Sequence, residues 1–252
     1  MRPLAVGILL WVLLALPVPS RAGSELAPAC GAPEEFITAD EPLAQVTAAI
    51  AAGGPIDVLA IGSATTVETV STGGPDSSFP WQMVHELQRA LPKVKFGITV
   101  RGGRGMTAED MLALMAAELK QRRYPLVLWQ TGTVEAVRGL RPDAMAETLH
   151  DGADLVRDAG GDLVLIDPQF SRFLRANTDL DPYEGVMQQV ATMPGVVLFQ
   201  RFELMRTWAN DGRVDLERAP RDERDKALAE LNVCLGQALA RFVLSGVDAA
   251  KK

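Results

Sequence analysis

The sequence contains little histidine, and this scarcity limits the chemistry that the chain can perform. Of its 252 residues only two are histidines, His85 and His150. They lie in different predicted helices, without further ligands at the spacing of a metal site, so we predict no metal centre and no cofactor. Both are expected to be ordinary surface or boundary side chains. No histidine follows His150, which leaves the C-terminal part of the chain without a side chain that titrates near neutral pH.

Positive charge is also scarce. The chain has 25 basic residues against 32 acidic ones, for a net charge of −7, and its main basic cluster is residues 120–123. A chain this acidic is a poor candidate for binding nucleic acid or an anionic membrane surface. We therefore expect neither of them as a partner.

Long apolar runs are missing except for residues 4–16, near the N-terminus. Arg2 precedes this run and residues 20–22 follow it, which is the pattern of a secretory signal peptide cleaved after Ala22. The run has about thirteen residues, against the roughly 20 that span a bilayer, and this argues against a retained membrane anchor. We predict a periplasmic or secreted protein without a membrane span, whose mature form is a single domain, residues 23–252.

Cysteine is nearly absent, since only Cys30 and Cys234 occur. In a protein exported to an oxidising compartment, this pair predicts one disulfide between the N-terminal arm and the last helix. A catalytic or metal-binding thiol is the alternative, but no histidine or second cysteine lies near either residue in the sequence.

The rest of the chain alternates between short apolar runs and helical patterns. Strands are predicted at residues 56–61, 94–100, 126–130, 163–166 and 196–199. Helices are predicted at residues 42–52, 79–91, 107–123, 143–158, 182–193, 202–209 and 225–244, with a polar, mobile loop from the fourth strand to residue 181. This alternation predicts right-handed βαβ units and therefore a parallel sheet with helices on both faces.

Turns at the carboxyl edge of such a sheet form the usual crevice for binding or chemistry. Three of them are rich in small and polar residues: residues 62–66, 101–107 and 131–137. These three turns are the places where we expect a functional site.

Together with two later segments, these turns resemble the sequence blocks of the SGNH (GDSL-type) hydrolases of the secreted bacterial kind. The resembling blocks are Ile-Gly-Ser-Ala-Thr-Thr at residues 61–66, Arg-Gly-Gly-Arg-Gly at 101–105, Trp-Gln-Thr-Gly-Thr at 129–133, Asp-Pro-Gln at 167–169 and Cys-Leu-Gly at 234–236. The resemblance covers nearly the whole predicted mature chain. It implies a three-layer α/β/α, flavodoxin-like domain with five parallel strands in the order 2-1-3-4-5. The family acts on esters of lipids and of acetylated carbohydrates.

The sequence departs from that family at the positions that carry the chemistry. Ala64 stands where the resemblance places the nucleophilic serine, and a methyl group cannot attack a carbonyl. Val134 replaces the asparagine that binds the oxyanion, and Glu135 replaces the acid that follows it. The last Asp and His of the family fall near Glu223 and Lys226, and a lysine stays protonated at neutral pH unless it is strongly desolvated.

We therefore expect a pseudoenzyme that binds a glycan or acyl-bearing ligand, or a protein partner, through the old active-site crevice. The alternative is an active ester hydrolase, of the esterase, lipase or deacetylase type, that uses Ser63 in an altered geometry. A third class is an interaction protein that uses its helix faces and not the crevice. The candidate ligand-binding residues are Ser63, Thr65, Gly102, Arg104, Gly105, Thr133 and Glu135.

Several of these candidates also have a purely structural explanation. Ser63 and Thr65 are typical turn residues whose hydroxyls bond the local backbone. Gly102 and Gly105 allow backbone conformations with positive φ, besides offering N–H groups to a ligand. Arg104 places a charge where the family has glycine, and we expect it to fill or gate the pocket that the catalytic groups have left.

Overall fold

The computed structural model describes residues 28–67 and 74–251. Within them, five strands form one sheet: β1 (Ile56–Gly62), β2 (Phe96–Gly102), β3 (Leu126–Gln130), β4 (Asp162–Ile166) and β5 (Val196–Phe199). Their order is β2-β1-β3-β4-β5 and each neighbouring pair is parallel, which confirms the predicted topology. The predicted signal peptide, residues 1–22, lies outside the described residues.

The strands form because short, continuous runs of Val, Leu and Ile suit a sheet that is covered on both faces. Every residue of β3 and β4 is buried. At the carboxyl edge, Gly62 of β1 pairs with Gly102 of β2 on one side and with Gln130 of β3 on the other. The ends of these three strands, which carry the candidate residues, therefore lie side by side.

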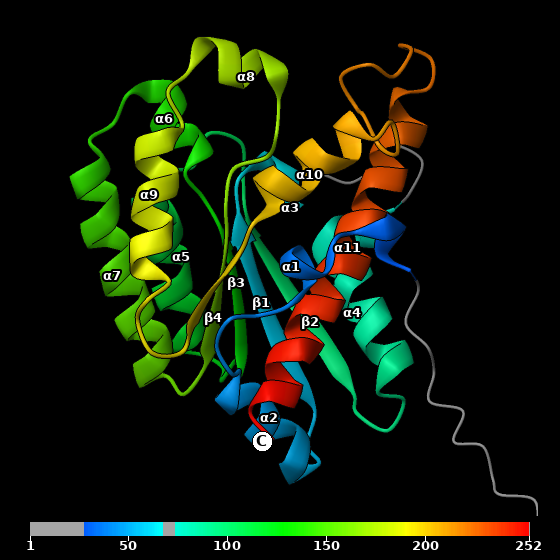
Figure 1. Ribbon diagram of the computed structural model, residues 1–252. Coiled ribbons are helices and arrows are strands. Elements are labelled where there is room, and N and C mark those ends of the chain that lie inside the picture. Colours follow the sequence, from blue (N-terminus) through cyan, green and yellow to red (C-terminus); the bar gives the residue numbers. More distant parts are fainter. Residues whose placement is uncertain (1–27, 68–73, 252) are drawn as a thin grey trace, which may run out of the picture.

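Helices cover the sheet on both faces, as Figure 1 shows. One face packs on α5 (Ala108–Leu119), α7 (Pro142–Asp158) and α9 (Asp181–Val190). The other face packs on α2 (Ala44–Ala52), α4 (Phe79–Ala90) and the long α11 (Arg224–Ala249). The N-terminal arm contributes η1 (Ala29–Gly31) and α1 (Glu34–Ile37), and η2 (Pro75–Ser77) precedes α4. The result is the predicted three-layer α/β/α fold.

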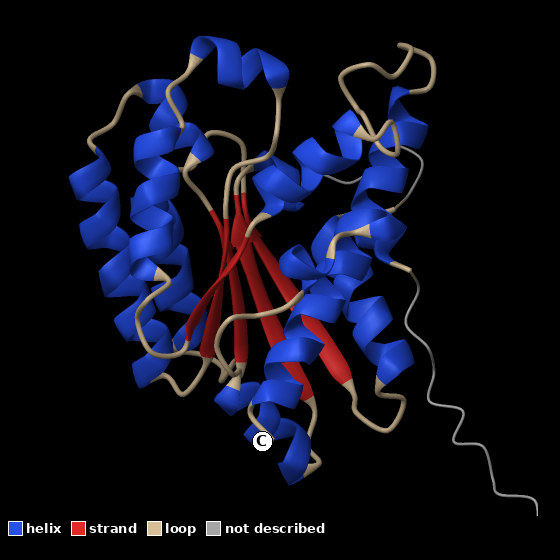
Figure 2. Ribbon diagram, in the orientation of Figure 1, coloured by secondary structure: helices blue, strands red, loops and turns tan. Residues whose placement is uncertain are grey.

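Four further helices lie toward the carboxyl end of the sheet, in the upper half of Figures 1 and 2. They are α3 (Ala64–Val67), α6 (Thr133–Arg138), α8 (Arg172–Asn177) and α10 (Arg201–Asn210). The first two begin inside turns that we had predicted without helix. The prediction of a loop up to residue 181 is wrong for α8, which Ser171 caps by accepting a hydrogen bond from the Leu174 N–H at 3.2 Å.

The last helix is longer than predicted: α11 ends at Ala249, whereas the prediction ended at residue 244. In the part of the chain that the structure describes, α11 is also the one helix that is long and apolar enough to cross a membrane, a property that we did not recognise in the sequence. It lies in the protein core, where residues such as Leu235, Leu239 and Val243 are buried against the sheet.

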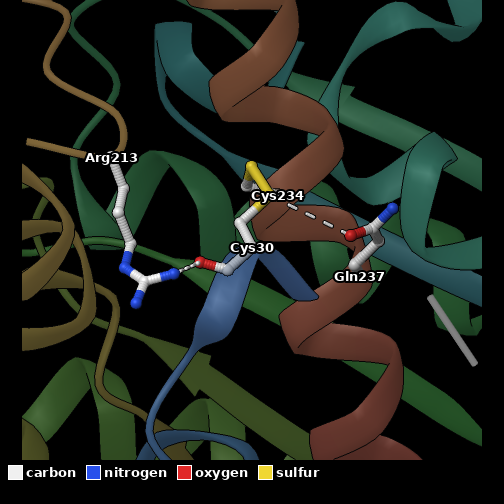
Figure 3. The surroundings of a disulfide bond; sticks show 4 residues. All are labelled: Cys30, Arg213, Cys234 and Gln237. Atoms are coloured by element: carbon white, nitrogen blue, oxygen red, sulfur yellow. Dashed lines mark hydrogen bonds between the residues drawn. A yellow bond between two sulfur atoms is a disulfide. The ribbon is translucent and has the colours of Figure 1, made fainter. Parts of the chain in front are cut away.

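A disulfide joins Cys30 in the arm to Cys234 in α11, as predicted, with Cα atoms 5.4 Å apart (Figure 3). Arg213 also holds the arm, because its Nη1 donates to the Cys30 carbonyl oxygen at 3.5 Å. The cross-link closes a loop with a sequence separation of 204. For a loop of that size the chain-entropy estimate of the stabilisation is about 5 kcal/mol, an upper value. A disulfide is consistent with an oxidising, extracellular or periplasmic compartment.

A buried carboxylate fastens the opposite end of the sheet. Asp162 Oδ2, at the start of β4, accepts hydrogen bonds from the Gln45 N–H at 2.8 Å and the Val46 N–H at 2.9 Å. These donors belong to the first turn of α2, where a negative charge is favourable. Burial nevertheless raises the pKa of Asp162 to about 6, because desolvation outweighs both hydrogen bonds.

Candidate functional site

The carboxyl ends of the strands bring together residues that are far apart in the sequence. Ser63 follows β1, Gln130 ends β3, Asp167 follows β4, and Arg201 opens α10 just after β5. The turn with Ser63 continues directly into α3, whose first residue is Ala64. We refer to the surroundings of these five residues as the crevice.

The side-chain oxygen of Gln130 is the common acceptor of the crevice. Its Oε1 lies 3.2 Å from the Ser63 backbone nitrogen and 3.0 Å from the Ser63 Oγ. The hydroxyls of Thr65 and Thr66 lie 3.3 Å and 3.0 Å from the same oxygen. A single amide oxygen thus binds the start of α3 to the end of β3.

This contact limits the chemistry that Ser63 can perform. An amide oxygen does not take up a proton at neutral pH, so Gln130 is no general base for the Ser63 hydroxyl. In the part of the chain that the structure describes, no hydrogen bond or ion pair joins Ser63 to a histidine or a carboxylate. Ala64, half-buried next to it, presents only a methyl group.

Arg201 is the charged group of the crevice, and its side chain is only 1% exposed. Its Nε donates to the Asp167 carbonyl oxygen at 3.1 Å, and its Nη1 donates to the Thr65 Oγ1 at 3.2 Å. The guanidinium carbon also lies 5.9 Å from the centre of the Phe79 ring. Burial lowers the pKa of Arg201 to about 10, so the guanidinium remains charged at neutral pH.

The Asp167 carboxyl group acts on the pKa of Arg201 through its charge, and it is buried as well. Its Oδ1 accepts a hydrogen bond from the Phe202 N–H at 2.9 Å. Burial raises the pKa of Asp167 to about 8, against the opposing effects of that hydrogen bond and of the Arg201 charge. The carboxyl group therefore holds a proton over much of the neutral range and supplies no full counter-charge to Arg201.

Two buried donors of the crevice have no hydrogen-bond partner among the residues that the structure describes. They are the Nε2 of Gln130 and the Nη2 of Arg201. A buried donor without a partner costs about 1–3 kcal/mol, and more when it carries charge. Of these two side chains, Arg201 also lines a cavity, so its surroundings are the part of the crevice that is open to a molecule from outside.

The turn after β3 uses its polar side chains differently. Glu135 is buried, and its two carboxylate oxygens accept hydrogen bonds from the N–H groups of Ala108 and Gly132, at the starts of α5 and α6. Because its oxygens are engaged by two helix N-termini, this candidate serves as a brace between helices. Val134 lies in the first turn of α6 and offers no side-chain donor, whereas the buried Thr133 Oγ1 has no hydrogen-bond partner among the described residues.

The turn after β2 is shaped by a close approach of two strands. Gly102 has φ +131°, and a Cβ at this position would lie 1.8 Å from the Gly62 carbonyl oxygen. That oxygen accepts the Gly103 N–H at 3.2 Å, so this N–H already has a partner. Gly105 also has a positive φ, +76°, and Arg104 is exposed. The close approach to Gly62 and the positive φ therefore explain why glycine occupies position 102, without a role in ligand binding.

The residues that fall near the last catalytic block of the family lie away from the crevice contacts. Glu223 and Lys226 are both exposed at the start of α11. Of the two histidines, His85 is exposed on α4 beside Trp81, and the Nδ1 of His150 lies 2.7 Å from the Ala146 carbonyl oxygen within α7. The structure brings none of these four side chains into hydrogen-bonding contact with Ser63.

Three central residues of the crevice were missing from the sequence-based candidates: Gln130, Asp167 and Arg201. Ligands of parallel sheets bind at the carboxyl ends of the strands, and this rule could have identified all three. Each is the last residue of a predicted strand or follows its carboxyl end by at most two residues. The burial of Arg201 had no such signal, because long cationic side chains are usually exposed.

The fold and the strand order define the class of the protein, an SGNH-hydrolase-like α/β/α protein. Residues 29–249 match the Non-GDSL lipase-like family, and the chain therefore belongs to that family. No curated protein matches the sequence.

Solved structures with the same fold include two esterases. The crystal structure of TesA is 19% identical, with a TM-score of 0.52, and the match covers 69% of this chain and 94% of that one. A catalytic mutant of Axe2, an acetylxylan esterase from Geobacillus stearothermophilus, is 16% identical with a TM-score of 0.56, over 71% of this chain and 93% of that one. A two-domain esterase (CEX) active on acetylated mannans is 12% identical with a TM-score of 0.60, over 82% of this chain and 56% of that one. At these sequence identities, the similarity shows a shared fold and does not extend to activity.

Proposed function

We propose that this protein has lost ester hydrolysis and binds a glycan or acyl-bearing ligand through the crevice. The observation that carries the proposal is the hydrogen bond of the Ser63 hydroxyl to the Gln130 amide oxygen, 3.0 Å long, next to the methyl group of Ala64. A hydroxyl held by an amide has no group to take its proton, and the neighbouring position has no hydroxyl at all.

The electrostatic part of the catalytic machinery is weakened too. Val134 has no donor for a developing oxyanion, and the loss of one such donor typically costs about 3–4 kcal/mol of transition-state stabilisation. Lys226 is exposed at the start of α11, away from the crevice contacts, and is no substitute for a histidine base. A nucleophile, an oxyanion donor and a base are thus all replaced.

Ligand binding is supported by what the crevice retains. Arg201 lines a cavity and carries a donor without a partner among the described residues, and an acceptor bound in that cavity would compensate for the cost of burying this cation. Two of the similar structures act on acetylated xylan or mannan, which makes an acylated glycan the ligand class suggested by the fold.

The competing function is an active ester hydrolase that uses Ser63. It is favoured by the position of this hydroxyl at the carboxyl end of β1, in a fold whose solved examples include esterases. The two functions are separated by incubating the purified mature protein with p-nitrophenyl acetate, p-nitrophenyl butyrate and a fluorophosphonate probe. We expect neither turnover nor labelling, and activity that Ser63→Ala abolishes would refute the pseudoenzyme.

A rebuilding experiment tests the reason for the inactivity. We expect Ala64→Ser alone to remain inactive because the base is still missing. The triple variant Ala64→Ser, Val134→Asn, Lys226→His adds a hydroxyl, an amide donor and an imidazole. Because position 226 is exposed and lies away from the crevice contacts, we expect this variant to remain inactive as well, and turnover by it would contradict this placement of the missing base. If the protein instead works through its helix faces alone, no acylated glycan or ester will raise its melting temperature.

We further propose that the mature protein is periplasmic or secreted, after cleavage behind Ala22. The disulfide between Cys30 and Cys234 supports export, because such bonds persist in oxidising compartments. N-terminal sequencing of the protein recovered outside the cytoplasm checks the cleavage site, and a protein that keeps residues 1–22 would contradict the proposal.

A further inference from the structure

A separate cavity opens beside the crevice, between α10 and the first half of α11. Its volume is about 230 Å³, and Thr65 and Arg201 form part of its wall. At about 30 Å³ per water molecule, this is the space of about eight waters. The cavity therefore suits a small molecule of about eight non-hydrogen atoms rather than an oligosaccharide.

The positive charge beside this cavity lacks a counter-ion. Arg201 is buried, and it forms no ion pair with any carboxylate in the part of the chain that the structure describes. Its Nη2 has no hydrogen-bond partner among these residues, and burial raises the pKa of Asp167, which weakens the counter-charge that this carboxyl group supplies to Arg201. A buried, unpaired cation is costly, and an anion bound next to it would remove that cost.

The remaining wall of the cavity is mainly apolar. Phe79, Leu228, Leu231 and Leu235 line it, and the last three follow one another along one side of α11. The side-chain amides of Gln169 and Asn232 are the other polar groups in the wall. A ligand that fills this cavity needs a single anionic end for Arg201 and an aliphatic body for the leucines.

We propose that the cavity binds a free monocarboxylate with a short aliphatic chain, of about the size of hexanoate. The planar carboxylate matches the guanidinium of Arg201 in shape and charge, with the Thr65 hydroxyl beside it, and the chain packs on the leucines of α11. One cationic side chain in the wall favours a singly charged ligand over a phosphate dianion. This inference rests on the proposed ligand-binding function. It states which acyl compound binds: the free carboxylic acid, and not an ester of that acid.

The test is isothermal titration calorimetry of the full mature protein with sodium hexanoate at neutral pH. Hexanamide and 1-hexanol, which have the same chain without the charge, are the ligand controls. We expect saturable one-to-one binding of hexanoate. The dissociation constants of the two neutral molecules should be at least about tenfold larger, because they cannot form a charged hydrogen bond with Arg201. Equal affinity for hexanamide would overturn the role of Arg201, and absence of hexanoate binding would overturn the proposal.

Variants on α11 test the site without replacing the buried Arg201. Leu228 is half-buried in the wall, and Leu228→Trp fills the cavity, so we expect it to weaken hexanoate binding at least about tenfold, by blocking a pocket of this size. Val233→Trp places the same side chain on an exposed position of the same helix and should leave the affinity unchanged. Hexanoate binding that Leu228→Trp does not alter would contradict this site.

The same titrations distinguish this inference from the wider proposal. If an acetylated xylo-oligosaccharide binds and hexanoate does not, the carboxylate site is refuted and the ligand-binding function stands. If p-nitrophenyl butyrate is hydrolysed in a Ser63-dependent way, the pseudoenzyme is refuted whether or not hexanoate binds.

Discussion

The amide of Gln130 makes a quantitative prediction, because one side-chain oxygen accepts from four donors at the start of α3. Leucine at this position has nearly the same size and no acceptor. In Gln130→Leu the Ser63 N–H and the hydroxyls of Ser63, Thr65 and Thr66 all lose their shared partner.

The cost follows from the burial of these groups. The Ser63 N–H is left in a buried turn, for about 2 kcal/mol, and the three hydroxyls together lose about 2 kcal/mol because each can rotate toward another acceptor. The added apolar burial of leucine returns roughly 1 kcal/mol. We therefore expect Gln130→Leu to lower the free energy of unfolding by about 3 kcal/mol.

Urea unfolding followed by far-UV circular dichroism measures this change. The matched control is Gln189→Leu on the exposed face of α9, which should shift the free energy of unfolding by less than about 0.5 kcal/mol. A loss below about 1 kcal/mol for Gln130→Leu would show that the four contacts are not made in solution, and Ser63 would then be free to act as a nucleophile.

Three further predictions concern the frame around the crevice. The pKa of Asp162 is raised from 3.8 to about 6, so its contribution to stability is full below pH 3.8 and is lost as pH rises through 6. Relative to Asp162→Asn, the free energy of unfolding of the wild type should therefore fall by about 2 kcal/mol between pH 4 and pH 7 in urea titrations, and parallel pH curves for the two proteins would contradict this. Gly102→Ala should destabilise by at least about 2 kcal/mol, because its Cβ would meet the Gly62 carbonyl oxygen at a positive φ, whereas Gly54→Ala, in open space, should be nearly neutral in the same assay. Replacing Cys30 and Cys234 together by serine should cost up to about 5 kcal/mol, and unreduced wild-type protein that takes up two equivalents of iodoacetamide by mass would contradict the disulfide itself.

Much of the fold was predictable because its strongest signals are local. β3 and β5 occur at the predicted residues, since continuous apolar runs between polar turns leave little choice of position. The helix start at Thr107 was equally clear, and the structure adds the reciprocal bond of Asp110 to the Thr107 backbone. By contrast α8 has six residues and a Phe173 that is 70% exposed, so it shows no amphipathic period.

The site was harder to predict because its contacts join distant segments. Gln130 lay inside a block that we quoted, yet its role depends on the register that sets the end of β3 beside Gly62. Arg201 gave no hint of burial, since its environment is built by Phe79, Thr65 and Asp167 from three other elements. Glu135 had a suggestive residue type, but its partners Ala108 and Gly132 are backbone groups that no sequence pattern displays.

The cross-link between the arm and α11 also constrains the rotation of that helix about its own axis, together with the packing of the helix in the core. Cys234 lies between Leu231 and Leu235, and with 3.6 residues per turn a small rotation would turn these leucines away from the cavity. Reduction of the disulfide would remove this constraint on α11 without removing a single residue of the cavity wall. The setting of the wall residues therefore depends in part on a covalent bond that lies outside the cavity.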